Sequence, residues 1–279
     1  MKVTVIISTY NSPDWLEKVL WGYYMQEHKA FEIVIADDGS GEETRRRIDR
    51  VREETKMEIH HVWHHDNGYQ RQTILNQAIL QASTPYLIFT DGDCIPRKDF
   101  VSVHLKYVEK GRFLSGGYCK LPMDVSLHIS REDIFKQLCF DYEWLYERGL
   151  RGNSQRRKLR AKKGWGKFLD FVTPATATFN NCNTSAWKDD IIAVNGYDER
   201  MKYGGSDREI GERLTNFGVT GKQIRHQAIV VHLDHERGYK TNDSIQFNLN
   251  IRKQTRQLRK TWTEWGILKE KVVTANSLK

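Results

Sequence analysis

Two carboxylates stand two residues apart in the triplet Asp91-Gly92-Asp93, directly after the apolar run YLIFT. Carboxylate oxygens suit a hard divalent cation, and Mg²⁺ or Mn²⁺ held by few protein oxygens keeps coordination positions for substrate phosphates. Gly92 permits a tight turn and the close approach of a ligand. Such triplets also occur by chance in loops, so it is the position after a strand-like run that favours a metal site.

A second acidic pair, Asp37-Asp38, follows the apolar run FEIVIA. In nucleotide-binding sheets, an acid near the end of the second strand contacts the ribose or the base. Alternatively, the pair only caps a helix before the Gly39-Ser40 turn, which leaves one of the two acids unexplained. Asp38 is therefore a candidate for nucleotide binding.

Polar residues also follow the first apolar run, VTVIIS, in the order Thr9, Tyr10 and Asn11. The Tyr10 ring can stack on a nucleotide base. The chain contains no GxGxxG and no GxxxxGK[ST], which disfavours NAD binding and a P-loop. The sequence therefore predicts a nucleotide site of another type.

The segment YGGSDREIGERL places Asp207 at the start of a predicted helix, after the tight turn that Gly204-Gly205 allows. A carboxylate in this position can act as a general base. The alternative is structural: Ser206 caps the helix, while Asp207 and Glu209 interact favourably with its dipole. The segment alone does not decide between the two.

His232 ends another apolar run, in the segment VVHLDH, with Asp234 and His235 beside it. A single histidine at a strand end is most often structural. Because the DxD triplet lies in the same domain, His232 is also a candidate for a further metal ligand.

The elements that must position these residues alternate between strands and helices in the first half of the chain. The expected strands are Val3–Ser8, Phe31–Ala36, Glu58–Trp63 and Tyr86–Thr90. Three helices are expected between them: one that begins after Ser12, one at Glu42–Thr55 and one at Arg71–Ala82. This rhythm predicts an α/β fold, a Rossmann-like and mostly parallel sheet with helices on both faces. Ligands bind beyond the carboxyl ends of such strands, where the polar clusters fall.

The second half is less regular. Strands or extended segments are expected at Phe113–Tyr118, Thr173–Thr178 and Ile229–Leu233, and helices at Phe135–Glu147, Lys188–Val194, Ser206–Phe217 and Ile245–Leu268. No internal repeat or low-complexity linker is evident.

Composition excludes several classes of protein. The chain has 279 residues, 39% of them hydrophobic, which is enough for a sizeable core and argues against disorder. No apolar run approaches eighteen residues, so no transmembrane helix is expected, and the N-terminus does not read as a signal peptide. The four cysteines of the chain are widely spaced. This spacing predicts buried, reduced thiols and hence a cytoplasmic location.

The net charge of +8 is concentrated in one place. Residues 151–167 contain eight Lys or Arg and no acid, and elsewhere basic and acidic residues are equal in number, at 36 each. Such a run suits an anionic partner such as phosphate or acidic lipid. Leu159, Trp165 and Phe168 are interleaved, as in segments that lie on anionic membranes. A solvated loop is the open alternative.

Taken together, the segments VTVIISTYN, FEIVIADDGS and YLIFTDGDCIP resemble the inverting glycosyltransferase family 2, which has the GT-A fold. The later segment NCNTSAWKDDIIAVNGYDERMKYGGSDREIGERL resembles the C-terminal part of galactosyltransferase-type enzymes. The two resemblances cover residues 1–100 and roughly 178–235.

The resemblance implies roles for individual positions. A divalent metal, Mn²⁺ or Mg²⁺, would be bound by Asp93 and His232, and Asp207 would be the catalytic base. The donor would contact Thr9, Tyr10, Asn11, Asp38, Arg71 and Asp91, with Tyr10 and Asp38 at the base and Asp91 near the sugar or ribose. Two departures matter: Ser206 stands where an acid usually precedes the base, and the QxxRW element of processive synthases is missing, which argues against polymer synthesis.

The resemblance also implies an overall function. We expect residues 1–110 to form the nucleotide-sugar-binding half, residues 111–240 the acceptor-binding and catalytic half, and residues 241–279 a helical extension. The expected reaction is inverting transfer from a UDP-sugar to a glycan or lipid-linked saccharide, as in cell-surface polysaccharide or lipopolysaccharide synthesis. Residues 151–167 would add peripheral contact with the inner face of an anionic membrane.

Two other functions each explain part of the sequence. A nucleotidyltransferase acting on sugar phosphates shares acidic metal ligands on an α/β sheet, but it carries a Gly-rich, basic signature after the first strand that TYNSPDW lacks. A nucleic-acid-binding module would explain residues 151–167, but it would leave the DxD triplet and the GGSD segment unexplained.

Overall fold

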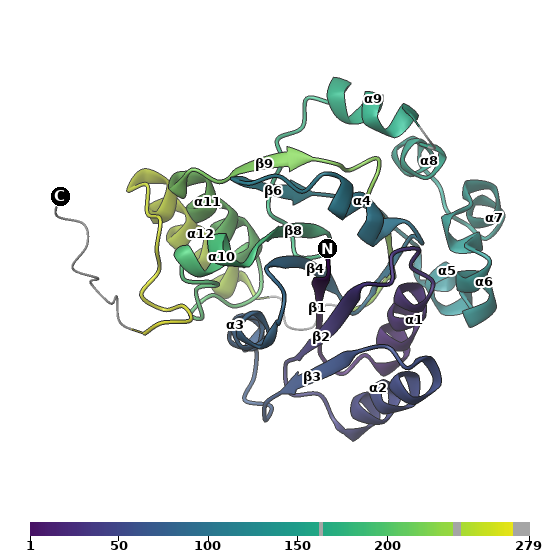
Figure 1. The fold of residues 1–279 in the computed structure, drawn as a ribbon, viewed down its shortest axis with the longest axis horizontal. Coiled ribbons are helices and arrows are strands. Elements are labelled where there is room, and N and C mark those ends of the chain that lie inside the picture. Colours follow the sequence, from purple (N-terminus) through teal and green to yellow (C-terminus); the bar gives the residue numbers. More distant parts are fainter. Residues whose placement is uncertain (162–163, 237–240, 270–279) are drawn as a thin grey trace.

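The computed structural model describes residues 1–161, 164–236 and 241–269 (Figure 1). Its centre is a seven-stranded sheet in the order β3-β2-β1-β4-β8-β6-β9. The strands of this sheet are β1 (Val3–Thr9), β2 (Phe31–Asp37), β3 (Ile59–Trp63), β4 (Tyr86–Asp91), β6 (Arg112–Ser115), β8 (Thr184–Trp187) and β9 (Thr220–Gln223). Strands β3, β2, β1 and β4 are parallel, whereas β8 runs antiparallel to both of its neighbours.

The register of the parallel strands brings the predicted polar clusters to one edge. Thr9 at the end of β1 lies opposite Asp37 of β2, and Ser8 lies opposite Asp91 of β4. All seven residues of β1 are buried, as expected for a central strand covered on both faces. The chain therefore leaves the core at three neighbouring points.

Helices cover both faces of the sheet, as the sequence predicts (Figure 1). Helices α1 (Pro13–Tyr24) and α2 (Glu42–Thr55) pack on the face that presents Val3, Val5 and Ile7. Helices α3 (Arg71–Gln81), α10 (Lys188–Ala193) and α11 (Ser206–Phe217) cover the opposite face. This mixed α/β arrangement is the GT-A fold.

A second sheet of three strands lies beside the first. Its order is β5-β10-β7, with β5 (Cys94–Pro96), β10 (Ile229–His232) and β7 (Gly117–Lys120). Within this sheet His232 lies opposite Cys94, so the residue after the DxD triplet faces the end of β10. The triplet and His232 are thereby brought together from distant parts of the sequence.

Some elements differ from the prediction. The expected strand at 113–118 is two strands, β6 and β7, in different sheets. The chain is interrupted at Gly116, where a Cβ would lie 2.0 Å from Asn183 Oδ1. The expected helix at 135–147 is broken into α6 (Arg131–Phe135), a 3-10 helix (Leu138–Phe140) and α7 (Tyr142–Glu147). The expected extended segment at 173–178 forms no strand.

The terminal helix is shorter than predicted. Helix α12 (Asn242–Gln257) ends early, and the chain folds back so that Ile267 N donates to Asn195 O. Helix α12 packs against α11, the helix that carries Asp207. The remaining helices are α4 (Phe100–Lys106), α5 (Met123–His128), α8 (Asn153–Arg160) and α9 (Gly164–Val172).

Residues 151–167 contain all of α8 and the start of α9, so most of their described part is helical. The four cysteines are buried and free, which agrees with the prediction of reduced thiols. Among the described residues, no helix combines the length and apolar character needed to cross a bilayer.

Candidate active site

A cavity of about 700 Å³ opens at the carboxyl ends of β1, β2 and β4. It is the place where an α/β sheet binds its ligand. All eight residues predicted to bind donor or metal line this cavity: Thr9, Tyr10, Asn11, Asp38, Arg71, Asp91, Asp93 and His232. The sequence therefore identified side chains that the fold collects around one space.

The residues after β1 form the first wall of the cavity. Asn11 has a left-handed backbone, with φ of 44°, and its Oδ1 accepts from Gly41 N at 2.9 Å. The Tyr10 ring is 44% exposed, and its hydroxyl donates to Asp66 at 2.9 Å, so a ring face can meet a base. The buried Thr9 Oγ1 has no hydrogen-bond partner among the described residues.

The adjacent acids Asp37 and Asp38 have different surroundings. Asp37 is fully buried, accepts from Ser40 N at 2.9 Å and pairs with His61 at 2.8 Å. The surroundings of Asp37 thus fit the alternative in which one acid of the pair has a structural role at the turn. Asp38 lines the cavity and contacts His64 Nε2 at 2.9 Å. Burial raises the pKa of Asp38, while the hydrogen bond with His64 acts in the opposite direction.

The two acids of the DxD triplet also separate. Asp91 accepts from Ser8 Oγ at 2.9 Å and forms an ion pair with Arg71, which itself donates to Ser8 Oγ at 2.8 Å. Burial opposes the charge of Arg71, but the negative charge of Asp91 prevails and raises the guanidinium pKa. Arg71, the first residue of α3, therefore forms an ion pair with Asp91, and both side chains line the cavity.

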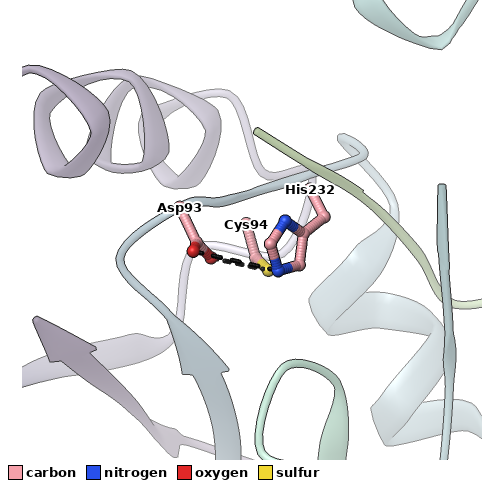
Figure 2. A group of neighbouring side chains, drawn as sticks. All are labelled: Asp93, Cys94 and His232. Atoms are coloured by element: carbon pink, nitrogen blue, oxygen red, sulfur yellow. Dashed lines mark hydrogen bonds and ion pairs between the residues drawn. The ribbon is translucent and has the colours of Figure 1, made fainter. Parts of the chain in front are cut away.

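Asp93 instead faces two histidines, His235 and His232, of which Figure 2 shows His232. Its Oδ2 lies 3.0 Å from His235 Nε2 and 3.8 Å from His232 Nε2, and its Oδ1 accepts from the Cys94 thiol at 3.2 Å. Burial would raise the pKa of Asp93, but the hydrogen bond with His235 and the charge of His232 outweigh it, so the pKa is lowered. Ligand atoms of Asp93, Cys94 and His232 all lie within 4.8 Å of one another.

Backbone carbonyls fix the orientation of both imidazole rings. His232 Nδ1 lies 2.8 Å from Leu233 O, and His235 Nδ1 lies 2.8 Å from Glu236 O. Because a carbonyl only accepts, each Nδ1 carries a proton, and in a neutral ring Nε2 then carries the lone pair. Two such nitrogens aimed at one carboxylate oxygen suit a cation held between them.

His235 was not among the predicted ligands, although the sequence places it three residues after His232. The two rings stack at 5.8 Å between centroids, with 13° between their planes. The repeated histidine in HLDH was the available signal. Burial raises the pKa of Cys94 well above its usual value.

Asp207 lies in the first turn of α11, close to the cavity but not on its described lining. Its Oδ1 accepts from Arg208 N at 2.8 Å. Burial raises the pKa of the Asp207 carboxyl, the charges of Arg208 and Arg71 lower it, and the charge of Asp91 adds to the rise. Arg71 and Asp91, which line the cavity, thus influence the pKa of Asp207 through their charges.

The local structure also bears on the purely structural alternative for this segment. Gly205, in the left-handed region at φ of 86°, is the N-cap of α11, and no side chain caps the helix there. Ser206 accepts from Gln72 of α3 at 2.8 Å instead. Glu209 is buried in an ion pair with Arg213. Helix capping therefore does not account for Ser206, whereas Asp207 keeps the first-turn position in which a carboxylate interacts favourably with the helix dipole.

The model of glycosyl transferase family 2 matches residues 4–166, which include Asp93 and the residues of β1, α3 and β4 that line the cavity. The chain belongs to this family. A second family model, described as the N-terminal domain of galactosyltransferase, matches residues 168–236, in the half for which the sequence resembled such enzymes. Asp207 and His232 lie within this second match.

Relatives in other organisms carry related names. The chain is 25% identical to the uncharacterized glycosyltransferase YfnE of Bacillus subtilis, over 89% of this chain and 69% of that protein. It is 27% identical to a validoxylamine A glucosyltransferase of Streptomyces hygroscopicus, over 87% of this chain and 58% of that protein. A Rickettsia felis glycosyltransferase is 30% identical over 113 residues, and this chain spans less than a fifth of its length.

Solved structures share the fold. A mannosyltransferase of Pyrobaculum calidifontis, in complex with GDP-Man and Mn²⁺, superposes with a TM-score of 0.58 at 18% identity, over 92% of this chain and 62% of that chain. TarS of S. aureus, residues 1–349 in complex with UDP-GlcNAc, gives 0.56 at 15% identity, over 86% of this chain and 60% of that chain.

Proposed function

We propose that this chain is an inverting, metal-dependent glycosyltransferase that moves a sugar from a nucleoside diphosphate sugar, with UDP as the favoured nucleotide, to a hydroxyl group of an acceptor. One observation carries the proposal: a single cavity is lined by the donor-side residues and by the Asp93–His232 pair, and Asp207 lies within reach of its charges. The family supplies the reaction class.

The donor side is assigned from the surroundings of each group. Tyr10 offers a ring face and Asp38 a carboxylate to the base, and Asn11 fixes the loop between them. The buried Thr9 hydroxyl, which lacks a partner among the described residues, supports a polar contact with the donor. Arg71 and Asp91, which form an ion pair on the cavity wall, are assigned to the ribose or the transferred sugar.

Asp93 and His232 are assigned as protein ligands of a divalent metal, with His235 as a further candidate. A carboxylate combined with imidazole suits Mn²⁺ better than Mg²⁺, which prefers oxygen ligands alone. When bound, such a cation neutralises negative charge that develops on the departing diphosphate. Mn²⁺ in the related mannosyltransferase structure is consistent with this assignment.

Asp207 is assigned as the general base. A raised pKa strengthens the carboxylate as a proton acceptor. It would take the proton of the acceptor hydroxyl as that oxygen bonds to the anomeric carbon and the bond to the diphosphate breaks. Because attack and departure occur on opposite faces of the sugar, the configuration inverts and no covalent intermediate forms.

We assign the acceptor to the class of glycans or lipid-linked saccharides, as in cell-surface polysaccharide or lipopolysaccharide synthesis. We also propose a cytoplasmic location, supported by the four free thiols, with peripheral contact of residues 151–167 at the inner face of an anionic membrane. Residues 1–110 would bind the donor, residues 111–240 the acceptor and the base, and residues 241–279 would form an extension, of which residues 270–279 lie outside the described residues.

The experiment is a panel of nucleotide sugars with and without Mn²⁺, read first by thermal shift and then by product. A true donor should raise the melting temperature by mass action, and more so with Mn²⁺. Turnover should release free nucleoside diphosphate. Release of pyrophosphate from a nucleoside triphosphate and a sugar phosphate would replace the proposal with a nucleotidyltransferase.

A further inference from the structure

Helix α9 carries a row of large apolar side chains that face solvent. Phe171 is 89% exposed and Trp165 is 66% exposed, while Phe168 and Val172 are about half exposed. Isolated exposed apolar residues are ordinary, but four on one nine-residue helix form a contiguous patch of the kind that marks an interaction site. In Figure 1, α9 lies at the periphery of the molecule, away from both sheets.

The other side of α9 is fixed firmly to the body of the protein. Asp170 accepts from His226 N and His226 Nδ1, both at 2.9 Å, and from Gln227 Nε2 at 2.8 Å. At Gly166 a Cβ would lie 2.8 Å from His226 O, so the helix backbone sits directly on this loop. These contacts fix the orientation of α9, so its apolar row faces solvent although the helix is packed against the rest of the protein.

Basic side chains lie on α9 and on α8. Not all of the basic residues that the sequence suggested as membrane contacts are free to face a partner. Arg156, Arg157 and Lys167 are exposed. Lys158 is instead half-buried and donates to Tyr118 O at 2.8 Å, and Arg160 pairs with Glu143. Leu159, expected from the sequence to touch a membrane, is buried and belongs to the core.

We propose that α9 lies in the interface of an anionic lipid bilayer, with Trp165, Phe168, Phe171 and Val172 among the acyl chains and Arg156, Arg157 and Lys167 at the headgroups. An apolar row beside cations matches the two parts of such a surface. A protein partner would need an acidic groove around an apolar centre, and nucleic acid would not use the apolar row.

The position of this surface relative to the cavity gives it a use, which rests on the proposed function. Lys158 of α8 holds the backbone of β7 at Tyr118, and the Tyr118 ring contacts His232 with centroids 6.2 Å apart. Helix α8, which carries Arg156 and Arg157, is therefore linked to the proposed metal site through Lys158 and Tyr118. The substrate class that fits is a saccharide carried on a lipid, whose head reaches the cavity from the membrane surface.

Vesicle sedimentation tests the surface without any sugar donor, so its result is independent of catalysis. The probes are vesicles of phosphatidylcholine alone and of phosphatidylcholine with phosphatidylglycerol. We expect binding to the anionic vesicles at low salt, and weakening as salt rises. Arg156→Gln with Arg157→Gln should weaken binding about 25-fold, at about fivefold for each charge. Phe168→Ser with Phe171→Ser should weaken it by about tenfold or more.

Matched controls separate a local surface from general charge or stickiness. Arg45→Gln with Arg46→Gln removes the same charge from α2, and Leu80→Ser with Phe217→Ser removes similarly exposed apolar groups from α3 and α11. Both should bind like the unaltered protein. The proposal is overturned if the unaltered protein ignores anionic vesicles, if the controls lose binding equally, or if the Phe variants bind normally. Self-association that the Phe variants abolish, without vesicle binding, would also overturn it and identify a second copy as the partner.

Discussion

Asn248 of α12 is expected to hold the turn that delivers the proposed base. Its fully buried side-chain amide donates to three successive carbonyls, Lys202 O at 3.0 Å, Tyr203 O at 3.1 Å and Gly204 O at 2.8 Å. An amide nitrogen has only two hydrogens, so three acceptors share them. These carbonyls immediately precede Gly205, the N-cap of α11, and Tyr203 lines the cavity.

Replacing Asn248 with Ala should therefore affect both stability and turnover. Removing the donors takes the side-chain partner from these part-buried carbonyls, which costs about 1–3 kcal/mol. For a domain of this size, a loss of about 2 kcal/mol lowers the melting temperature by roughly 4–8 °C. If the turn shifts by about an ångström, kcat should fall by roughly tenfold to a hundredfold. Asn248→Asp, which keeps the shape but places a carboxylate against carbonyls, should be at least as damaging.

The matched control is Asn216, near the opposite end of α11. Its amide donates to Thr255 O at 3.1 Å and Lys260 O at 2.9 Å, but it lies roughly 13 Å along the helix from Asp207. Thermal unfolding and steady-state kinetics would be measured on both variants. If Asn216→Ala and Asn248→Ala lose stability and kcat in the same proportion, the reasoning about positioning is wrong.

Three further predictions concern single groups. Asp93→Asn should abolish metal-dependent transfer with little change in melting temperature; full activity in the presence of chelator would contradict the metal assignment. Asp207→Asn should lower kcat about a hundredfold or more while donor affinity stays nearly constant. Because the Asp207 pKa is raised in the free protein, the acidic limb of the kcat/KM profile of the unaltered protein should lie above the usual aspartate value, and a limb at that value would refute the prediction. Burial lowers the pKa of His104 to about 4, from 6.5. The folded protein therefore keeps His104 neutral in a pH range in which the unfolded chain already binds a proton. The free energy of unfolding should fall by about 3 kcal/mol as pH falls from 6.5 toward 4. Denaturant titrations should show the stabilities of the unaltered protein and His104→Asn converging near pH 4.

The sequence alone was sufficient for the parallel half of the fold and for the candidates around the cavity. The strands that end at Thr9, Asp37 and Asp91 are apolar runs followed by polar residues, a pattern that depends only on neighbours in the chain. Since the ends of parallel strands meet at one edge, local patterns were enough to predict that these groups converge. The GGSD turn was readable for the same reason, because glycine allows the left-handed backbone there.

The tertiary structure decided how neighbouring acids divide their roles. Nothing local distinguishes Asp37 from Asp38, or Asp91 from Asp93. The partners that do so are His61, Arg71 and His235, which reach them from other elements.

The same reason explains what sequence reasoning missed in the second half. The break at Gly116 arises because Asn183 fills the space beside it, and the role of Asn248 arises because α12 packs on α11. Which side of α9 faces out was decided by the anchoring of Asp170 on residues 226 and 227. Side-chain direction depends on the segment packed against it, and the distance along the chain hides that segment from any local pattern.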